Sequence, residues 1–489
     1  MTLHNQVQLI TYPDSMGGDL KALRHVLETH LADIAAGGVH ILPPFPSSGD
    51  RGFAPLTYLE IEPAFGTWED IAAIGQRFDV LVDLMVNHIS RQSPYFQDFL
   101  QKGRASEYAE LFLTLDKIWP GGEPVQDDID QMFLRRPLPY STYTIASTGE
   151  QERVWTTFGK TDPSEQIDLD IYSQHTKQLL KTFFLNFKMH GVKIVRLDAV
   201  GYVIKKLGTS CFFVEPDIYS FLDWVKELAD SLELELLPEV HAHYSTQYKL
   251  AERGFWIYDF ILPYRILEAL LTHRSGDLLD YLRTRPNRQF TMLDCHDGIP
   301  VKPDLDSLID TTAARRLVDL CIERGANLSL ILSEEHKSPD GFDVHQIRCT
   351  YYSALAEDDD AYLAARAIQL FTPGIPQVYY VGLLAGANDQ EAVASTGEGR
   401  EINRTNYTLE EIEARLDLPV VQRLLELIRF RNSYAAFGGD FEALDGGEQE
   451  LRLRWTLGDQ QCELTVDLPS GRSVIVYTDE QGRSAEYIV

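Results

Sequence analysis

Four apolar segments of this chain each end in polar side chains that could act on a sugar. A short apolar run bounded by polar residues is typical of a buried parallel strand. In a (β/α)8 barrel the C-terminal ends of the strands meet at one mouth, where such enzymes keep their active sites. Three carboxylic acids, one guanidinium and two imidazoles at these ends predict a site that cleaves a glycosidic bond: Asp198, Glu239, Asp297, Arg196, His88 and His296.

Two of the carboxylic acids fit the pair that cleavage with retention of configuration requires. Such a pair stands about 5–5.5 Å apart, and its surroundings keep one group ionised and the other protonated. Asp198 lies two positions after Arg196, on the same face of the strand, where the guanidinium favours the ionised form. Glu239 follows an apolar Leu-Leu-Pro segment that favours the protonated form. We therefore expect Asp198 to be the nucleophile and Glu239 the general acid.

The remaining groups fit supporting roles. Asp297, next to His296, can balance positive charge on the sugar in the transition state, and His88 and His296 can donate hydrogen bonds to sugar hydroxyls. Each element alone is weak evidence, because a single Asp after an apolar run is more often a cap of the following loop. A single histidine is likewise more often structural. Four such elements in the order of one barrel favour the catalytic interpretation.

The elements that must position these groups alternate between strand and helix. Residues 7–12 predict a first strand. Asp19 then caps a helix with apolar residues at helical spacing, which Gly37 and Gly38 end before a second strand over 39–43. This alternation predicts an α/β protein built on a (β/α)8 TIM barrel. Later helices and strands are expected near 172–190, 216–232, 257–262 and 374–380.

Two insertions and a terminal β-domain complete the predicted organisation. The stretch after His88 is rich in aromatic residues, proline and glycine, and a second irregular stretch precedes the last barrel strand. From about residue 438 the chain alternates between apolar and polar residues, which is typical of an antiparallel sheet. The expected parts are a barrel over 1–88, 171–298 and 357–437, an inserted domain after strand three over 89–170, a second insertion after strand seven over 299–356, and a C-terminal antiparallel β-domain over 438–489.

The composition excludes several classes of partner. The 489 residues include 44 basic and 74 acidic side chains, for a formal net charge of −30. That field repels nucleic acid and anionic membranes, so neither is an expected partner, and an anionic substrate needs a local cluster of cations. No stretch approaches the ~20 apolar residues of a membrane span. The first residues lack a secretory pattern, so a cytoplasmic protein is expected.

Neither a metal nor a cofactor is expected. The five cysteines are widely spaced and form no Cys-x-x-Cys pair, which argues against a disulfide framework and a zinc site. No glycine-rich nucleotide loop follows a strand. His241 and His243 alternate along a strand and so point to opposite faces, which disfavours chelation by both. We expect a monomer or a homodimer.

The motifs resemble the four signature regions of the alpha-amylase family over essentially the whole chain. They are Asp83-x-x-x-Asn87-His88, Arg196-x-Asp198, Glu239 and His296-Asp297. Ile194 and Cys295 stand where the wider family usually has Gly and Asn, which argues against an ordinary starch hydrolase. The chain is more similar still to the sucrose phosphorylase branch, through the segments 7–12, 38–43, 196–202, 208–212, 350–355 and 376–382.

The resemblance implies a role for each matched residue. Asp198 would carry the covalent glucosyl group, Glu239 would be the acid and base, and Asp297 would stabilise the transition state. Phe53 would be an aromatic platform beside the sugar, although the same residue could also be core filler. The residues expected to hold the glucosyl ring are Asp50, Phe53, His88, Arg196, His296 and Arg400.

The acceptor side is where members of this branch differ. His345 stands where sucrose phosphorylases carry Tyr, and Arg135 and Arg136 lie in the first insertion. Two guanidiniums and an imidazole suit a phosphorylated fructosyl group, because Arg binds phosphate bidentately. One arginine could instead serve the attacking inorganic phosphate while the other faces solvent. The residues expected to bind acceptor and phosphate are Arg135, Arg136, His241, Asp343, His345 and Gln346.

The resemblance thus implies a glycosyltransferase-type glycoside phosphorylase. It would move glucose from sucrose 6F-phosphate to inorganic phosphate with retention, through a covalent glucosyl-enzyme, giving α-D-glucose 1-phosphate and fructose 6-phosphate. Alternative donors are unphosphorylated sucrose, glucosylglycerol and glucosylglycerate. The alternatives of another class are an amylase-like hydrolase or transglucosidase and a non-catalytic partner subunit. The last usually lacks the catalytic carboxylates, which are all present here.

Overall fold

A computed structural model of the chain describes residues 3–331 and 337–489, except for the side chain of Asp50. The chain divides into two compact units. The first consists of residues 41–240 together with 331 and 337–341, and the second of residues 3–40, 241–330 and 342–489.

Parallel strands form the central sheet. Within the described residues there are eight of them, in the order β10-β11-β15-β1-β2-β3-β8-β9, and they make a nearly closed barrel. The predicted (β/α)8 fold class is confirmed. The strands are β1 (Gln8–Thr11), β2 (Gly38–Ile41), β3 (Val80–Met85), β8 (Val192–Asp198), β9 (Glu235–Pro238), β10 (Ile257–Asp259), β11 (Gln289–Thr291) and β15 (Ile375–Tyr379).

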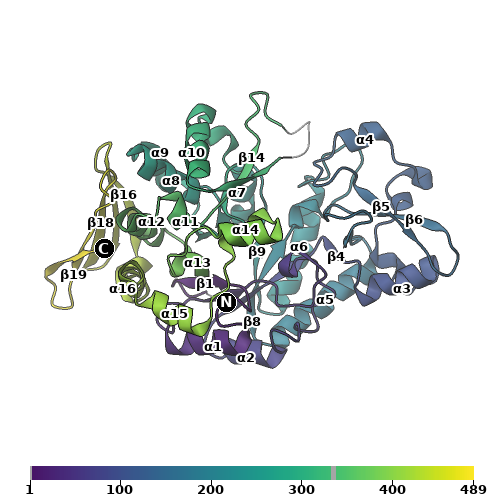
Figure 1. Cartoon of the computed structure of the whole chain (residues 1–489), viewed down its shortest axis with the longest axis horizontal. Helices are drawn as coiled ribbons and strands as arrows, with labels where there is room; N and C mark the ends of the chain where they lie inside the picture. The colour runs from purple at the N-terminus through teal and green to yellow at the C-terminus, as the bar shows by residue number, and fades with distance from the viewer. Residues whose placement is uncertain (1–2, 332–336) are drawn as a thin grey trace. The chain divides into compact units, whose positions relative to one another are not determined.

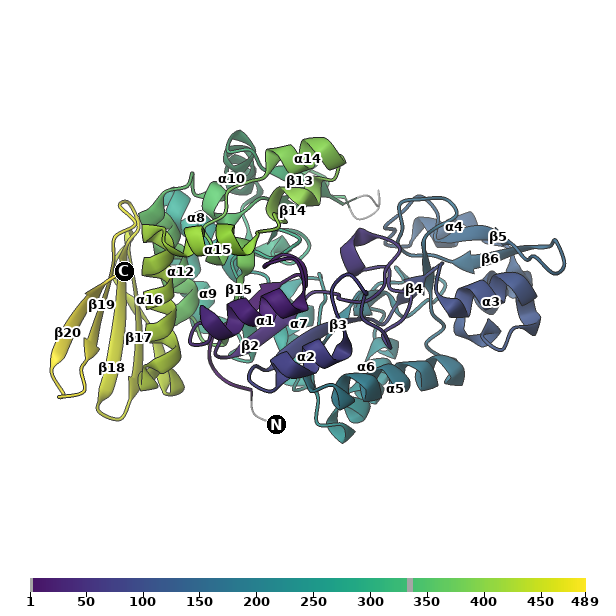
Figure 2. The ribbon, with the colours of Figure 1, turned by 60° about the horizontal axis from the view of Figure 1, so that its bottom comes forward.

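In the first unit, the strands β3, β8 and β9 are buried and pair in parallel. The register sets Asp83 opposite Arg196, and Arg196 opposite Leu237. All six residues of β3 are buried, as expected for a strand covered on both faces. The helices α5 (Gln174–Met189) and α6 (Asp217–Ser231) lie where the sequence predicted them (Figure 2). α2 (Trp68–Gly75) precedes β3.

The insertion after β3 has its own small core within the first unit. Its strand β4 (His88–Ser90) pairs antiparallel with β7 (Gln166–Asp168), which sets His88 opposite Asp168. Phe96, Phe99 and Phe112 centre one apolar cluster, and Trp119 stacks on Trp155 with ring centroids 5.6 Å apart. The boundaries given for this insertion stay a prediction. Its other elements are α3 (Pro94–Lys102), α4 (Gln126–Asp130), β5 (Tyr140–Thr144) and β6 (Gln151–Trp155), seen together in blue in Figure 2.

In the second unit, the first helix begins as predicted and ends earlier. The Asp19 carboxylate accepts a hydrogen bond from the Ala22 amide at 2.7 Å and caps α1 (Leu20–Thr29). The chain then turns well before Gly37. A side chain at Gly37 would meet the Gln6 carbonyl at 2.1 Å, so close approach of two backbones, and not the helix end, requires glycine there.

Two strands of the second unit are shorter than predicted. β11 ends at Thr291 because the chain then follows the fully buried Asp294, whose carboxylate accepts hydrogen bonds from the Tyr351 amide and the Arg366 guanidinium, each at 3.0 Å. β10 ends at Asp259, since its carboxylate accepts a bond from the Leu262 amide at 3.0 Å and the helix α8 (Leu262–Thr272) begins there.

Helices and short strands make up the rest of the second unit before its terminal sheet. Among the described residues, β12 (Ile299–Pro300), β13 (Asn327–Leu330) and β14 (Val344–Arg348) form a small antiparallel sheet in the order β12-β14-β13. The helices are α7 (Tyr244–Glu252), α9 (Gly276–Thr284), α10 (Thr311–Glu323), α11 (Tyr351–Ala354), α12 (Asp359–Phe371), α13 (Tyr380–Leu383), α14 (Gln390–Thr396), α15 (Leu409–Leu416) and α16 (Pro419–Ser433).

An antiparallel sheet follows α16, as the alternating pattern predicted. In the part of the chain that the structure describes it has five strands, packed beside α12 and α16 (Figure 1, yellow). The Trp455 indole donates to the Phe371 carbonyl at 2.7 Å, which ties the sheet to the end of α12. The strands are β16 (Asp440–Asp445), β17 (Glu450–Leu457), β18 (Gln460–Asp467), β19 (Ser473–Thr478) and β20 (Ser484–Ile488).

Two further sequence expectations concern the described residues as a whole. None of their helices is both long enough and apolar enough to cross a bilayer. All five cysteines have free thiols, and burial raises the pKa of the Cys321 thiol to about 11 and that of Cys462 to about 12. Such thiols stay protonated and unreactive near neutral pH.

Replacing the cap of α1 should weaken the fold measurably. Asp19→Ala leaves the Ala22 amide without its partner, so we expect the free energy of unfolding to fall by about 1 kcal/mol, seen as a lower melting temperature. Lys21→Ala, an exposed change in the same helix, is the control and should have little effect. Equal melting temperatures for the two variants would show that the cap contributes nothing.

Candidate active site

One buried guanidinium joins three carboxylates in the first unit. Arg196 is paired with Asp83, lies 2.9 Å from Asp198 (Nη1 to Oδ1) and lies 3.1 Å from Glu239 (Nη2 to Oε1). The exposed fractions of the side chains are 4% for Arg196, 0% for Asp83, 15% for Asp198 and 12% for Glu239. Asp83 is thus fully buried, whereas Asp198 and Glu239 keep part of their surface exposed.

The strands place these groups by their register. Asp83 and Arg196 are paired residues of β3 and β8, and Asp198 is the last residue of β8. Glu239 follows β9, and its amide donates to the Leu197 carbonyl at 3.0 Å. The sequence predicted an apolar setting for Glu239. The structure instead brings its carboxylate to the guanidinium, because β9 continues the β8 register to its end.

Two aromatic residues border the guanidinium. The Phe53 ring lies 5.9 Å from the Arg196 guanidinium carbon, and Phe53 is 6% exposed. Tyr58, which the sequence analysis missed, accepts a hydrogen bond from the Met85 amide at 2.8 Å through its hydroxyl. Burial raises the pKa of Tyr58, and the charges of Asp198 and Asp83 raise it further, so the phenol stays neutral beside the carboxylates.

The imidazole of His88 is held by the backbone. Its Nε2 lies 3.1 Å from the Phe53 carbonyl oxygen, so that nitrogen carries the proton and donates to the carbonyl. Its ring stands 5.3 Å from the Phe158 ring. The side chain of Asp50, a predicted glucose ligand, is outside the described residues.

A buried ammonium near this group was not predicted. Lys205 lies in the loop after β8 and contacts Asp168 and Asn87, each at 2.8 Å. The Asn87 amide in turn donates to Asp168 at 3.1 Å. The sequence analysis singled out Asn87 as part of a motif with His88. The spacing of residues along the chain did not connect Asn87 with Lys205 or Asp168.

The second unit holds the third predicted carboxylate among cations. Asp297 lies 3.5 Å from His296 (Oδ2 to Nε2), 3.4 Å from Arg400 (Oδ1 to Nε) and 3.8 Å from Arg404 (Oδ1 to Nη2). Arg404 also donates to the His296 carbonyl at 3.1 Å, and its guanidinium stands 5.7 Å from the Tyr12 ring. The structure therefore brings together three predicted residues, and adds Arg404 and Tyr12.

Two predicted histidines meet elsewhere in the second unit. The rings of His241 and His345 lie edge to face, 5.4 Å apart. His345 Nδ1 donates to the Lys302 carbonyl at 2.6 Å, and His241 Nδ1 lies 3.0 Å from the fully buried Asp304 carboxylate. Both rings are thereby oriented through the same nitrogen.

The other two predicted acceptor residues lie near His345 in the chain. Gln346 is a buried residue of β14, opposite Pro300 and Ser329. Asp343 is half-buried immediately before β14.

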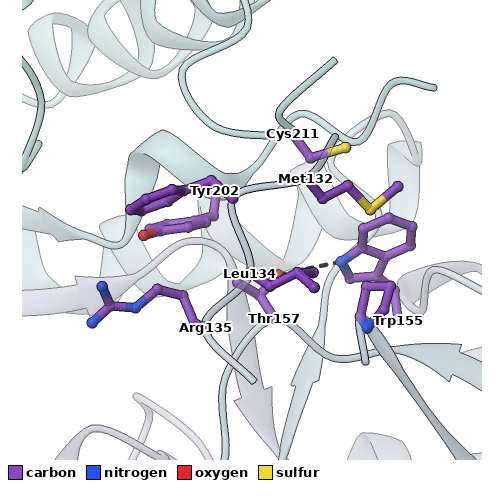
Figure 3. Close-up of a pocket in the computed structure, with 9 residues that line it drawn as sticks. Met132, Leu134, Arg135, Trp155, Thr157, Tyr202 and Cys211 are labelled. Atoms are coloured by element: carbon purple, nitrogen blue, oxygen red, sulfur yellow. Dashed lines mark hydrogen bonds between the residues drawn. The ribbon is translucent and has the colours of Figure 1, made fainter. Parts of the chain in front are cut away.

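The two adjacent arginines of the insertion behave differently. Arg135 and Tyr202 both line a small pocket of the first unit (Figure 3). Burial raises the pKa of Tyr202 to about 12; Arg135 opposes the rise and the nearby Glu239 charge adds to it. Tyr202 is therefore a neutral phenol under the influence of both the Arg135 guanidinium and the Glu239 carboxylate. The other walls of the pocket are Met132, Phe133, Leu134, Pro139, Trp155, Thr157 and Cys211.

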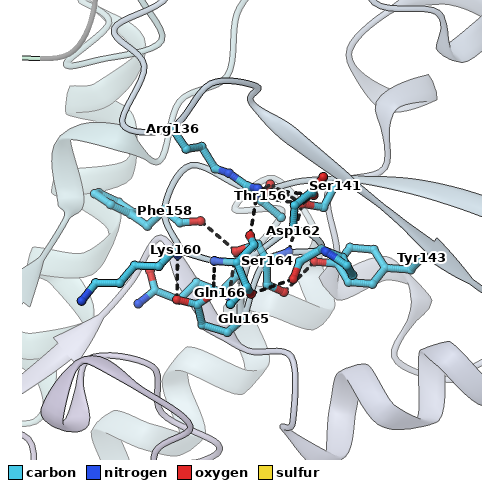
Figure 4. Close-up of polar contacts among 12 residues, drawn as sticks. Arg136, Ser141, Tyr143, Thr156, Phe158, Lys160, Asp162, Ser164, Glu165 and Gln166 are labelled. Carbon is cyan, nitrogen blue, oxygen red and sulfur yellow. Dashed lines mark hydrogen bonds and ion pairs between the residues drawn. The ribbon is translucent and has the colours of Figure 1, made fainter. Parts of the chain in front are cut away.

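Arg136 is buried in hydrogen bonds of the insertion itself. Its guanidinium donates to Thr156 at 2.7 Å and to Ser141 at 2.8 Å, and also to the Thr161 carbonyl at 3.1 Å (Figure 4). Asp162 lies 3.5 Å away. The guanidinium thus clamps the β5–β6 hairpin to the segment that follows it, and it does not face solvent.

Comparison with known proteins places this chain among characterised relatives. Residues 6–249 match the family described as alpha amylase, catalytic domain. The sucrose 6(F)-phosphate phosphorylase of Thermoanaerobacterium thermosaccharolyticum is 65% identical over 489 residues, with 100% of both chains covered. The glucosylglycerol phosphorylase of Marinobacter adhaerens is 46% identical over 480 residues, with 98% of each covered.

The fold matches a solved structure of the same kind. The crystal structure of sucrose 6F-phosphate phosphorylase from Thermoanaerobacter thermosaccharolyticum aligns with a TM-score of 0.99 at 65% identity, over 100% of this chain and 99% of that one. The chain belongs to the alpha-amylase family. Its full-length relatives are glycoside phosphorylases, and the chain is an enzyme of that family, which confirms the resemblance seen in its motifs.

Arg196 can be tested without removing its charge. Arg196→Lys keeps one positive charge, but an ammonium is a point donor and cannot reach three carboxylates as a planar guanidinium does. We expect kcat for the activated donor α-glucosyl fluoride to fall by about 100- to 1,000-fold, as for loss of a preorganised electrostatic contact.

The matched control is Arg24→Lys, at an exposed pair with Glu28. It should keep wild-type kcat. Retention of full activity by Arg196→Lys would show that the three-carboxylate arrangement is dispensable.

Proposed function

We propose that this enzyme is a sucrose 6F-phosphate phosphorylase. It transfers the glucosyl group of sucrose 6F-phosphate to inorganic phosphate and releases α-D-glucose 1-phosphate and fructose 6-phosphate. The observation that carries the proposal is the 65% identity, over the full length of both chains, with a relative of that name. The cationic and imidazole side chains described on the acceptor side support it.

The first chemical step forms the covalent intermediate. Asp198 Oδ attacks the anomeric carbon of the glucosyl group, and the bond from that carbon to the fructosyl oxygen breaks. Glu239 donates its proton to the leaving oxygen, so fructose 6-phosphate departs as a neutral alcohol at that position. The configuration at the anomeric carbon inverts once.

The shared guanidinium lets Glu239 change role between the steps. With Asp83 and Asp198 ionised, one Arg196 charge faces two carboxylates, and a third negative charge on Glu239 is disfavoured by repulsion. Once Asp198 carries glucose it is neutral. The guanidinium, 3.1 Å from Glu239, then stabilises the carboxylate that the acid has become.

In the second step phosphate replaces Asp198. A phosphate oxygen attacks the anomeric carbon from the side that fructose left, the ester bond to Asp198 breaks, and any proton on the attacking oxygen passes to Glu239. A second inversion restores the α configuration. Phosphate must compete with ~55 M water, which requires that it be bound and oriented.

Asp297 is proposed to stabilise the positive charge that develops on the sugar. His296, Arg400 and Arg404 surround its carboxylate and hold it ionised and in place. His296 and Arg400 are further proposed to contact sugar hydroxyls, together with Asp50, Phe53, His88 and Arg196 on the first unit.

On the acceptor side we propose different roles for the two arginines. Arg135, which lines a pocket together with Tyr202, is the candidate for phosphate binding. Arg136 supports it by fixing the hairpin through Ser141 and Thr156. This refines the expectation that both bind phosphate, because the two terminal nitrogens of Arg136 already donate within the insertion.

The two histidines are proposed to complete the acceptor site. His241 and His345 lie in contact and are both oriented through Nδ1, which directs Nε2 toward a ligand. The buried Asp304 carboxylate favours the imidazolium form of His241. Asp343 and Gln346 are proposed to bind the fructosyl hydroxyls.

Glucosylglycerol should also be tested as a donor, because one relative of the chain is named for it. The glucosylglycerol phosphorylase of Marinobacter adhaerens shares 46% identity over 98% of both chains. Glucosylglycerol and unphosphorylated sucrose are therefore included as donors in the assays below.

The product and its dependence on phosphate test the reaction class. The wild-type enzyme should convert sucrose 6F-phosphate into the α anomer of glucose 1-phosphate, detected by proton NMR, and phosphate should accelerate donor consumption strongly. Asp198→Asn should abolish turnover. Glu239→Gln should be slow on sucrose 6F-phosphate and much less impaired on α-glucosyl fluoride, whose leaving group needs no proton.

Two outcomes would contradict the assignment. Release of the β anomer would exclude two inversions and with them the role of Asp198. Equal rates of donor consumption with and without phosphate would make the enzyme a hydrolase.

Specificity is tested by kcat/KM on sucrose 6F-phosphate, sucrose and glucosylglycerol. We expect the phosphorylated sugar to be preferred by at least about 100-fold, since close charge pairs can supply several kcal/mol. His345→Tyr and Arg135→Ala should each reduce that preference, mainly by raising KM for the phosphorylated sugar.

Arg136→Ala separates the two arginines. Because Arg136 is buried, its loss should lower the melting temperature as well as the activity, whereas Arg135→Ala should leave the melting temperature nearly unchanged. A wild-type preference for plain sucrose or for glucosylglycerol would overturn the proposed donor.

A further inference from the structure

The ammonium of Lys205 is buried among oxygens from separate parts of the first unit. Its side chain is 2% exposed. It contacts the Asp168 carboxylate and the Asn87 side-chain oxygen, each at 2.8 Å. It also lies 3.1 Å from the Thr157 hydroxyl, donates to the Tyr202 carbonyl, and stands 5.8 Å from the Trp155 ring. One cation thus joins the end of β3, the strand β7, the segment after β6 and the loop after β8.

Its counter-ion is equally enclosed. The Asp168 carboxylate is 0% exposed and accepts hydrogen bonds from the Thr157 amide at 2.8 Å, from the Thr157 hydroxyl, and from the Asn87 amide at 3.1 Å. Taking two charges out of water is costly, and a buried pair is often no more stabilising than apolar residues of the same size. A network in which every partner is satisfied instead fixes the geometry of the groups it joins.

The segments held by this network carry groups that the reaction needs. Asn87 is followed by His88, the proposed glucose ligand, whose imidazole donates to the Phe53 carbonyl. Tyr202 lines the same pocket as Arg135, and its carbonyl accepts a hydrogen bond from Lys205. Thr157 and Trp155 line the same pocket as Arg135 (Figure 3). The loop that contains Lys205 begins directly after Asp198.

We propose that Lys205 is a positioning residue: paired with Asp168, it fixes the loop after the nucleophile against His88 and against the Arg135 pocket. It does not touch the reacting atoms. It sets the distance between the groups that hold the glucosyl ring and those that bind the leaving group. An error of about 1 Å in such a distance can cost about 100-fold in rate. The inference rests on the proposed roles of Asp198 and His88, but not on which natural donor the enzyme prefers.

The chain offers a matched control at the next position. Lys206 pairs with Asp217 at 2.8 Å, with 52% and 33% of the two side chains exposed. An exposed pair of this kind contributes little to stability, and its partner Asp217 is not one of the residues bound to Lys205. Lys206→Met therefore controls for the loss of one positive charge in this loop.

The main variant keeps the buried charge balanced. Lys205→Met alone would leave Asp168 buried and unpaired, so the double variant Lys205→Met/Asp168→Asn removes both charges with little change in volume. Circular dichroism and the melting temperature establish that it is folded. We expect kcat for α-glucosyl fluoride and for sucrose 6F-phosphate to fall by about 100-fold, with KM changed by less than about threefold. Lys206→Met should match the wild type.

A second variant decides the matter if the double variant fails to fold. Lys205→Arg keeps the charge but moves the donors outward and changes their geometry. A fall of about tenfold or more in kcat at an unchanged melting temperature supports the positioning role. Wild-type kcat in either folded variant overturns it and leaves Lys205 a structural residue. Because α-glucosyl fluoride reports on Asp198 whatever the natural donor, failure of the wild type on sucrose 6F-phosphate would refute the proposed donor only.

Discussion

The first unit depends on one guanidinium that serves three carboxylates. A carboxylate as buried as Asp83 needs a fixed cation, and the register of β3 and β8 supplies Arg196 directly opposite it. That pairing sets the direction of the guanidinium, and the direction decides which other carboxylates it can reach. Asp198 and Glu239 are therefore placed by the same strand pairing that stabilises the core. Function and stability share a contact here, so neither can be altered alone.

Around this centre, cations are used as internal braces in a chain whose net charge is −30. Lys205 and Arg136 are buried in the first unit, and Arg366 pairs with Asp294 in the second. Each guanidinium or ammonium contacts oxygens from more than one segment of its unit. We therefore expect most of the excess acidic side chains to lie at the surface, where water solvates their charge.

The sequence predicted those parts of the fold and the site that depend on residues close together in the chain. The barrel, the terminal sheet, the cap Asp19 and the carboxylates at the ends of β8 and β9 could all be predicted, because each depends on local spacing. The length of β11 could not, since it is set by the contacts of Asp294 with Tyr351 and Arg366, residues distant in the chain. The same applies to Lys205, whose partners lie on three other segments. The prediction of apolar surroundings for Glu239 was wrong. The residues before it in the sequence are apolar, but its carboxylate contacts the Arg196 guanidinium in the fold.

Arg135 and Arg136 are adjacent in the sequence, but Arg135 lines a pocket whereas Arg136 is buried in hydrogen bonds of the insertion. Arg136 makes the β5–β6 hairpin rigid from within, and that rigidity determines where Arg135 is presented. In the proposed function the side chain at position 135 meets the acceptor, and Arg136 clamps the neighbouring hairpin without help from the barrel strands. One part of the acceptor preference can then change through substitutions in this segment, while the strands that hold Asp198 stay as they are.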